Sequence, residues 1–236
     1  MGGSVSREQM NDYRETVKDR LSEEAVAFLH TRFTKAAGPA GVMGPLQFQQ
    51  YMESVEVFKD RKISAEQRRR QRRAGGGGGS GVAGAFGFTR HHADAADDAA
   101  AEEEVEEEDS SDYYRHLFRG YDLDNAGVIT FKKFLIYHVA IVYSTEDLFH
   151  VIFNTYDEDG DGFLSLTDIK SVITAATRYV GDCDVNDREV RRVIDEEARR
   201  LMGFLDIRKQ GCVQREDMRL ITQKYPQILE KMKCLM

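Results

Sequence analysis

Tyr156-Asp157-Glu158-Asp159-Gly160-Asp161-Gly162-Phe163-Leu164-Ser165-Leu166-Thr167-Asp168 is the stretch that decides the fold of this chain. From Asp157 onward, carboxylates stand at loop positions one, three and five and therefore converge on one point. A hard divalent cation takes about six to eight oxygen ligands at such a point. Gly162 stands at position six, where the chain must turn sharply and where glycine adopts a positive φ most easily. The stretch therefore predicts a metal-binding loop.

The other ligands of this loop follow from the same spacing. Phe163 offers its carbonyl at position seven, Ser165 a water-bridged contact at nine, and Asp168 the closing carboxylate at twelve. This is the pattern of an EF-hand calcium loop, and the alternative is an acidic, glycine-rich turn that binds nothing. Asp168 is one methylene shorter than the usual glutamate, so we expect it to bind through one oxygen. One calcium ion is then expected, held weakly enough for magnesium to compete. The predicted metal ligands are Asp157, Asp159, Asp161, Phe163, Ser165 and Asp168.

Helical periodicity flanks the loop on both sides, and together the three parts define a predicted third EF-hand over residues 144–180. Apolar residues recur at helical spacing before and after the loop. Ser144 or Thr145 stands where a side chain could cap the first of these helices. The apolar positions are Leu148, Phe149, Ile152, Phe153 and Tyr156 before the loop, and Ile169, Val172, Ile173 and Ala176 after it.

Composition excludes several classes of protein. The chain has 236 residues and a formal charge of -8, which argues against general nucleic-acid binding. It has no apolar run long enough to span a bilayer and no secretory signal. Three scattered cysteines fit no zinc spacing and favour a reducing compartment. No nucleophile and base stand in a catalytic pattern, so we do not expect an enzyme.

Residues 20–58 predict a first EF-hand without an ion. Leu21 to Phe33 reads as a helix with one apolar face, and Leu46 begins another amphipathic segment. The glycine- and proline-rich loop between them contains no carboxylate. We therefore expect this hand to be purely structural.

Residues 59–111 predict a charged insert. A basic run is followed by Gly75 to Gly79 and then by an acidic tract from Glu102 to Asp109. Such a composition buries too little apolar surface to offset its ordering entropy, so we expect disorder. The basic run is either a solvated spacer or a contact for an anionic membrane, through Arg68, Arg69, Arg70, Arg72 and Arg73.

Residues 112–143 and 181–236 predict the second and fourth EF-hands, both degenerate. The second loop keeps Asp122 and Asp124, but Ala126 removes the ligand at position five and Lys133 puts a cation at position twelve. We expect that ammonium to repel a metal ion. The last loop keeps Asp206 and Asp217 at positions one and twelve and also has Gln210 and Gly211, but Arg208 stands at position three. Val213 is predicted to pair with Leu164 across a short ribbon.

Residues 1–19 predict an N-terminal segment with a lipid site. Met1-Gly2-Gly3-Ser4-Val5-Ser6 fits the N-myristoylation pattern, with Gly2 exposed after methionine removal. A short motif of this kind also occurs by chance, so a flexible start is the alternative.

The chain resembles the neuronal calcium sensor, calcineurin B and plant calcineurin B-like branch of EF-hand proteins. The resemblance rests on the first, ion-free hand, the lipid motif, the long link before the last hand, and two segments. These segments are Phe118 to Ile136 and Lys224 to Leu229. It implies an all-α sensor with four hands in two paired lobes, whose apolar groove holds a helix of a kinase, phosphatase or membrane protein.

Two functions remain open on this reading. The first is a myristoylated calcium sensor, cytoplasmic and reversibly attached to the cytoplasmic face of a membrane, which regulates a target protein. The second is a constitutive structural or scaffold subunit in which the surviving loop holds a structural magnesium or calcium ion.

Overall fold

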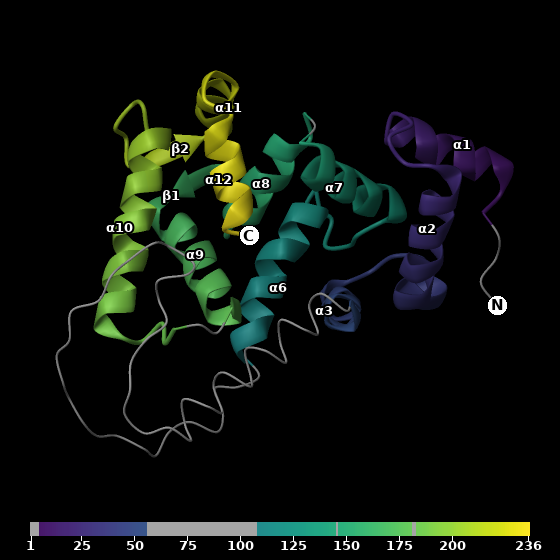
Figure 1. Ribbon diagram of the computed structural model, residues 1–236, viewed down its shortest axis with the longest axis horizontal. Coiled ribbons are helices and arrows are strands. Elements are labelled where there is room, and N and C mark those ends of the chain that lie inside the picture. Colours follow the sequence, from purple (N-terminus) through teal and green to yellow (C-terminus); the bar gives the residue numbers. More distant parts are fainter. Residues whose placement is uncertain (1–4, 56–107, 145, 181–182) are drawn as a thin grey trace, which may run out of the picture.

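The computed structural model describes residues 5–55, 108–144, 146–180 and 183–236. Within these ranges nearly all of the regular secondary structure is helical (Figure 1), which confirms the all-α prediction. Besides the helices there are a 3-10 turn, η1 (Gly38–Ala40), and two short strands, β1 (Phe163–Ser165) and β2 (Cys212–Gln214). The helices are α1 (Arg7–Thr16), α2 (Glu23–Ala37), α3 (Pro45–Ser54), α6 (Glu108–Tyr121), α7 (Phe131–Tyr143), α8 (Leu148–Tyr156), α9 (Leu166–Val180), α10 (Arg188–Leu205), α11 (Arg215–Lys224) and α12 (Gln227–Cys234).

Most of these helices follow one another as helix–loop–helix units, namely α2–α3, α6–α7, α8–α9 and α10–α11. The loops of the units pair in twos. Strands β1 and β2 run antiparallel with Leu164 opposite Val213, as predicted. Met43 and Ile129 form the corresponding bridge between the first two loops, with N···O distances of 2.9 and 2.8 Å. The first unit is therefore joined to the second, and the third to the fourth.

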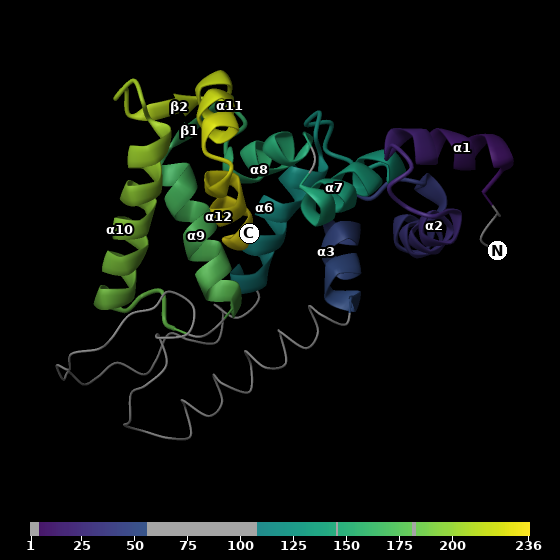
Figure 2. The ribbon, with the colours of Figure 1, turned by 45° about the horizontal axis from the view of Figure 1, so that its top comes forward.

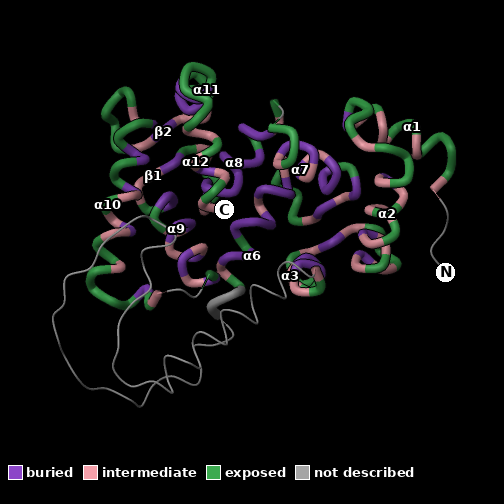
Figure 3. Tube along the Cα trace, viewed as in Figure 1, coloured by how far each residue is buried: buried purple, intermediate pink, exposed green. Residues whose placement is uncertain are grey.

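Helix α6 lies at the centre of the molecule, between α2 at one end and α10 at the other (Figures 1 and 2). It packs along α8 and α9 as well as against α3 and α7. Gly120 lets α6 approach α8 closely, because a Cβ on this residue would lie 2.2 Å from Thr155 Oγ1 of α8. At the other end of α6, Tyr113 stacks on Tyr179 of α9 with ring centroids 4.2 Å apart. The two pairs of units therefore share one core, whose buried positions gather around α6 and α8 (Figure 3).

The predicted insert 59–111 lies outside the described residues, except for its last four positions. Those four residues belong to α6, which begins at Glu108, so the predicted disorder is wrong at the end of the acidic tract. A packed helix extends readily by another turn, because each added residue gains a backbone hydrogen bond.

Helix α1 was not predicted from the sequence. Ser6 caps it, since Ser6 Oγ accepts from the backbone of Gln9 at 3.2 Å and the Gln9 side chain accepts from the backbone of Ser6 at 3.0 Å. This reciprocal pair is a capping box. Tyr13 of α1 packs edge-on against Phe131 of α7, with ring centroids 4.8 Å apart. The N-terminal segment is therefore folded onto the second unit from Arg7 onward.

The prediction that Ser144 caps α8 is wrong. Ser144 has φ 47° and ends α7 in the left-handed conformation, whereas α8 begins after Asp147. The hydroxyl of Ser144 donates instead to Glu230 of α12 at 2.8 Å. Thr145, the other candidate for the cap, lies outside the described residues.

Helix α12 closes the chain against the third unit. Met232 is fully buried, and the hydroxyl of Tyr156, the last residue of α8, donates to the Met232 carbonyl at 3.1 Å. The C-terminal helix thus contacts the residue immediately before the predicted metal loop. None of the described helices has the length and apolarity to cross a bilayer.

Candidate metal centre

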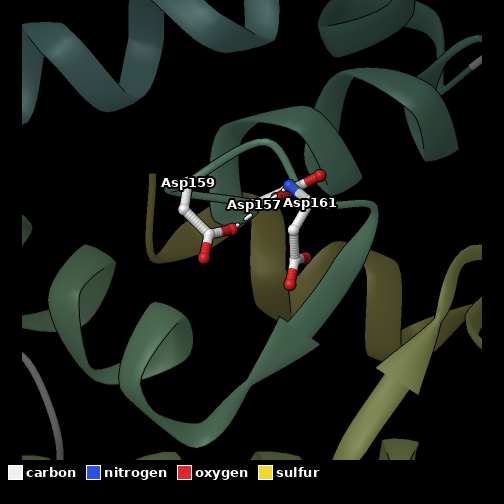
Figure 4. A group of neighbouring side chains, drawn as sticks. All are labelled: Asp157, Asp159 and Asp161. Carbon is white, nitrogen blue, oxygen red and sulfur yellow. Dashed lines mark hydrogen bonds between the residues drawn. The ribbon is translucent and has the colours of Figure 1, made fainter.

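Three carboxylates of the loop between α8 and β1 lie together. One ligand atom from each of Asp157, Asp159 and Asp161 falls within 4.8 Å of the other two, and Figure 4 shows the three on a single turn. Oxygens that share one calcium ion at about 2.3–2.6 Å can be at most about 5 Å apart. The three predicted ligands at positions one, three and five therefore already have the spacing that one ion requires.

The backbone of this turn is organised around Asp157. Gly160 and Gly162 have φ 73° and 83°, and this left-handed conformation lets the chain fold back over the carboxylates. The amide of Gly162 donates to Asp157 Oδ2 at 3.1 Å. Asp161 accepts from the amide of Phe163 at 2.7 Å, and the amide of Asp161 donates to Asp159 at 3.2 Å (Figure 4). Each carboxylate is thus held by main-chain donors of the loop itself.

The second oxygen of Asp157 is the atom that most directly indicates a cation site. Asp157 is buried, and its Oδ1 has no hydrogen-bond partner. Burial raises the pKa of Asp157; main-chain hydrogen bonds lower it, and the charges of Asp161 and Asp159 raise it further. A buried carboxylate oxygen without a partner is costly, and a divalent cation at the centre of the three carboxylates would supply the partner. The residues present therefore fit a calcium or magnesium ion.

The ligands predicted for the far side of the loop are placed differently. Asp168 and Ser165 lie outside the group of three carboxylates. Asp168 Oδ2 accepts from both the amide and the hydroxyl of Ser165, at 2.7 and 2.6 Å. These bonds close the first turn of α9 and hold Asp168 near its own helix start. Phe163 begins β1 with its ring partly exposed.

Two polar residues outside the loop hold the third unit against its neighbours, and neither was predicted from the sequence. Arg119 of α6 donates from Nη1 to the carbonyl of Asp157. Asn154 of α8 donates to the carbonyl of Leu123 in the second loop at 3.2 Å and accepts from Arg215 of α11 at 2.8 Å. The third unit is thus tied to the second and the fourth at the start of its loop. Asn154 could have been noticed in the sequence, because it is a polar residue among the apolar positions of the helix before the loop.

In the second loop, Lys133 was predicted to repel a metal ion. The structure places its ammonium among the oxygens of the loop itself. The ammonium of Lys133 lies 2.7 Å from Asp122 Oδ1 and 2.9 Å from the Val128 carbonyl, and it also donates to Asp124 Oδ1. Burial lowers the pKa of Lys133, but its hydrogen bonds to Asp122 and Asp124 and their charges outweigh this, so that the pKa lies above its usual value. The hydrogen bond from Lys133 lowers the pKa of Asp124.

The fourth loop is closed by an arginine. Arg208, at position three, forms an ion pair with the buried Asp217, at position twelve, with N···O 2.8 Å. Asp206, at position one, accepts from the amides of Gln210 and Gly211 at 3.0 and 2.8 Å. The carboxylate that would close a metal site is thus already paired with a side-chain cation. The first loop has no carboxylate to offer.

The other predicted site residues cannot be placed. Gly2 and the basic run of Arg68, Arg69, Arg70, Arg72 and Arg73 lie outside the described residues. In the part of the chain that is described, the cysteines form no disulfide. There, Asp157, Asp159 and Asp161 are the one group of acidic, histidine or cysteine ligands with a metal-binding spacing.

A match to a known protein family falls on the second unit. A family model described as an EF-hand domain pair matches residues 110–141, which cover most of α6, the second loop and most of α7. The match supports the EF-hand calcium-binding superfamily, whose members are typically non-enzymatic regulators. The loop that gathers the three carboxylates lies beyond the matched residues.

Proposed function

We propose that this protein is a calcium-binding regulatory protein whose calcium loop is Asp157 to Asp168. The observation that carries the proposal is the group of Asp157, Asp159 and Asp161, with a buried and unpartnered oxygen on Asp157. Asp157, Asp159, Asp161 and Asp168 would supply carboxylate oxygens, Phe163 its carbonyl and Ser165 a water-bridged contact. The ion would neutralise these charges and draw α8 and α9 toward one loop geometry.

Four EF-hands in two pairs are the architecture that we infer. The second, third and fourth loops share left-handed residues at positions four and six, with φ between 55° and 83°. In each of them the glycine amide at position six donates to the aspartate at position one, at 2.7, 3.1 and 2.8 Å. These features and the two bridges between loops support four hands in two pairs. The proposed assignment to the neuronal calcium sensor and calcineurin B branch rests on the sequence segments Phe118 to Ile136 and Lys224 to Leu229.

The target of such a regulator is a helix of another protein, in this proposal a kinase, phosphatase or membrane protein. Several large apolar side chains are available on the surface for contacts, among them Phe28, Val142 and Phe204, which are 60%, 68% and 54% exposed. The second candidate function is a constitutive scaffold subunit that holds magnesium. The ion pairs in the second and fourth loops favour it, because those loops need no calcium to be closed.

Hydrogen exchange separates these two functions. Adding calcium in the presence of magnesium should slow exchange in the loop 157–168 and in α9, and the binding of an apolar dye should change with it. We expect the effect to be small and, apart from the contact of Arg119 with the loop, confined to residues 144–236, because the partner loop is already closed by Arg208. A magnesium-filled scaffold would show neither change. Equal responses in both pairs of units would contradict the proposed location of the switch.

Membrane attachment is the second part of the proposal. Myristate on Gly2 gives marginal binding alone, with a partition constant of about 10⁴ M⁻¹. Each basic residue of the arginine run adds about 1 kcal/mol near an anionic leaflet. The protein would then be cytoplasmic and peripheral, and the acidic tract would compete with lipid for the arginines. Because Ser6 also caps α1, its presence in the lipid motif has a second explanation.

Liposome co-sedimentation of protein made with the acyl transferase tests the attachment. Gly2→Ala should abolish binding to anionic vesicles, because the lipid anchor is lost. Replacing the five arginines by glutamine should weaken binding. Raised salt should also weaken it, because salt screens the attraction between the arginines and the anionic lipid. The matched control is Gly3→Ala, which leaves the acceptor glycine intact. If Gly2→Ala binds vesicles as the wild type does, the lipid-anchor proposal fails and the protein is better described as a soluble adaptor.

A further inference from the structure

The second loop holds a cation that belongs to the chain. Lys133 donates to Asp122, Asp124 and the Val128 carbonyl, which stand at loop positions one, three and seven. Asp157, Asp159 and Phe163 hold the same positions in the third loop, where they are the proposed calcium ligands. The ammonium therefore lies among the groups that would coordinate an ion.

We propose that the ammonium of Lys133 is the resident cation of the second loop, and that it holds this unit in its ion-filled form without calcium or magnesium. An ammonium has three donors and no acceptor, and here each donor has one oxygen to bind. The ammonium belongs to the residue at position twelve, where an EF-hand loop otherwise has its closing carboxylate. The loop is therefore closed from the same position, with the sign of the charge reversed.

The backbone of the second loop matches that of the third, so the oxygens of the two loops can be compared position by position. Asn125 and Gly127 have φ 55° and 75°, close to the 73° and 83° of Gly160 and Gly162 in the third loop. The amide of Gly127 donates to Asp122 Oδ2 at 2.7 Å, as Gly162 does to Asp157. Both oxygens of Asp122 are thus bonded, whereas Oδ1 of Asp157 is not. In the second loop, the ammonium thus supplies the partner that the buried carboxylate oxygen at position one requires.

Burial makes the cation necessary to this loop. The side chains of Lys133 and Asp122 are 11% and 4% exposed, whereas that of Asp124 is 63% exposed. Removing the ammonium leaves Asp122 buried beside a second carboxylate with no positive charge. A simple surface ion pair has no such consequence, because water replaces the missing partner.

Lys133→Met tests the proposal in the full chain, in the Asp157→Ala background so that the third loop gives no response to ions. In chelator, the variant should lower Tm by roughly 10 °C, since it leaves a buried charge unpaired. Calcium at about 10 mM should restore a measurable part of the loss, because a mobile cation can then bind weakly between Asp122 and Asp124. The matched control is Lys132→Met in the same background. Lys132 is exposed and pairs with Asp12 at 2.7 Å, so we expect little loss and no restoration.

Two outcomes overturn the proposal. One is an unchanged Tm, and the other is a loss that neither calcium nor magnesium restores, which would make Lys133 an ordinary structural ion pair. If the variant does not fold, reductive methylation of the native chain decides the question by mass spectrometry. Lys133 should be methylated many-fold more slowly than Lys132, with or without calcium. Equal rates for the two lysines would show that the ammonium is not held in the loop.

Discussion

Asp157→Ala should abolish calcium binding to the chain. Asp157 supplies the ligand at position one, and its carboxylate also orients the turn through the amide of Gly162. Isothermal titration calorimetry of the wild type should show one site of roughly 10⁻⁶ to 10⁻⁵ M, toward the weak end of the sensor range because Asp168 closes the loop. The variant should show no calcium heat. At saturating calcium the wild type should also gain thermal stability that the variant lacks.

Asp206→Ala is the matched control for this experiment. Asp206 holds position one of the fourth loop and accepts from Gln210 and Gly211 as Asp157 does from Gly162. Its loop contains the Arg208–Asp217 ion pair, so we expect calcium binding to be unchanged. A site that survives Asp157→Ala, or two tight sites in the wild type, would refute the assignment. If Asp206→Ala instead loses the calcium site, the site belongs to the fourth loop.

Ala126→Asp together with Lys133→Glu should create a second calcium site. The double change supplies the missing oxygen at position five and replaces the resident ammonium by the usual closing carboxylate. Ala126 is exposed, and its amide already donates to Asp122 and Asp124 at 3.2 Å, so a side chain there lies beside the other ligands. Calorimetry should then report two binding events where the wild type has one.

The single variants separate the two requirements. Lys133→Glu alone gathers three carboxylates but no ligand at position five, and we expect no second event in the micromolar range. Ala126→Asp alone keeps the ammonium in place and should bind no added ion. If Lys133→Glu suffices, the loss of the ligand at position five is not what silences this loop.

The gathering of the three carboxylates in the first half of the loop 157–168 could be predicted from the sequence because it is local, whereas the structure does not bring Asp168 into that group. Asp157, Asp159 and Asp161 need only the turn at Gly162 to bring their oxygens together. The pairing of Leu164 with Val213 was predictable for a related reason, since both residues hold position eight of their loops. The positive charge at Lys133 was also visible. That its ammonium reaches three acceptors depends on the folded loop and was not.

Features that depend on distant contacts were missed. Gly120 has no local signal, and its role is to let α6 approach Thr155 of α8. Helix α1 has few apolar residues, so periodicity did not reveal it, although the spacing of Ser6 and Gln9 fits a capping box. Ser144 was misassigned because a serine before a helix suits both a cap and the end of the preceding helix. Its partner Glu230 lies 86 residues further along the chain, so no local pattern reveals this contact.

The bond from Arg119 to the carbonyl of Asp157 joins α6 to the loop that we propose to bind calcium. Arg119 belongs to the second unit, whose own loop is closed by Lys133, whereas the carbonyl belongs to the first residue of the proposed calcium loop. A ligand that shifts α6 therefore changes the affinity for calcium, to the extent that it strengthens or weakens this bond. Reciprocity then requires calcium to change the affinity for that ligand by the same factor. A unit that binds no ion can in this way set the calcium concentration at which its neighbour responds.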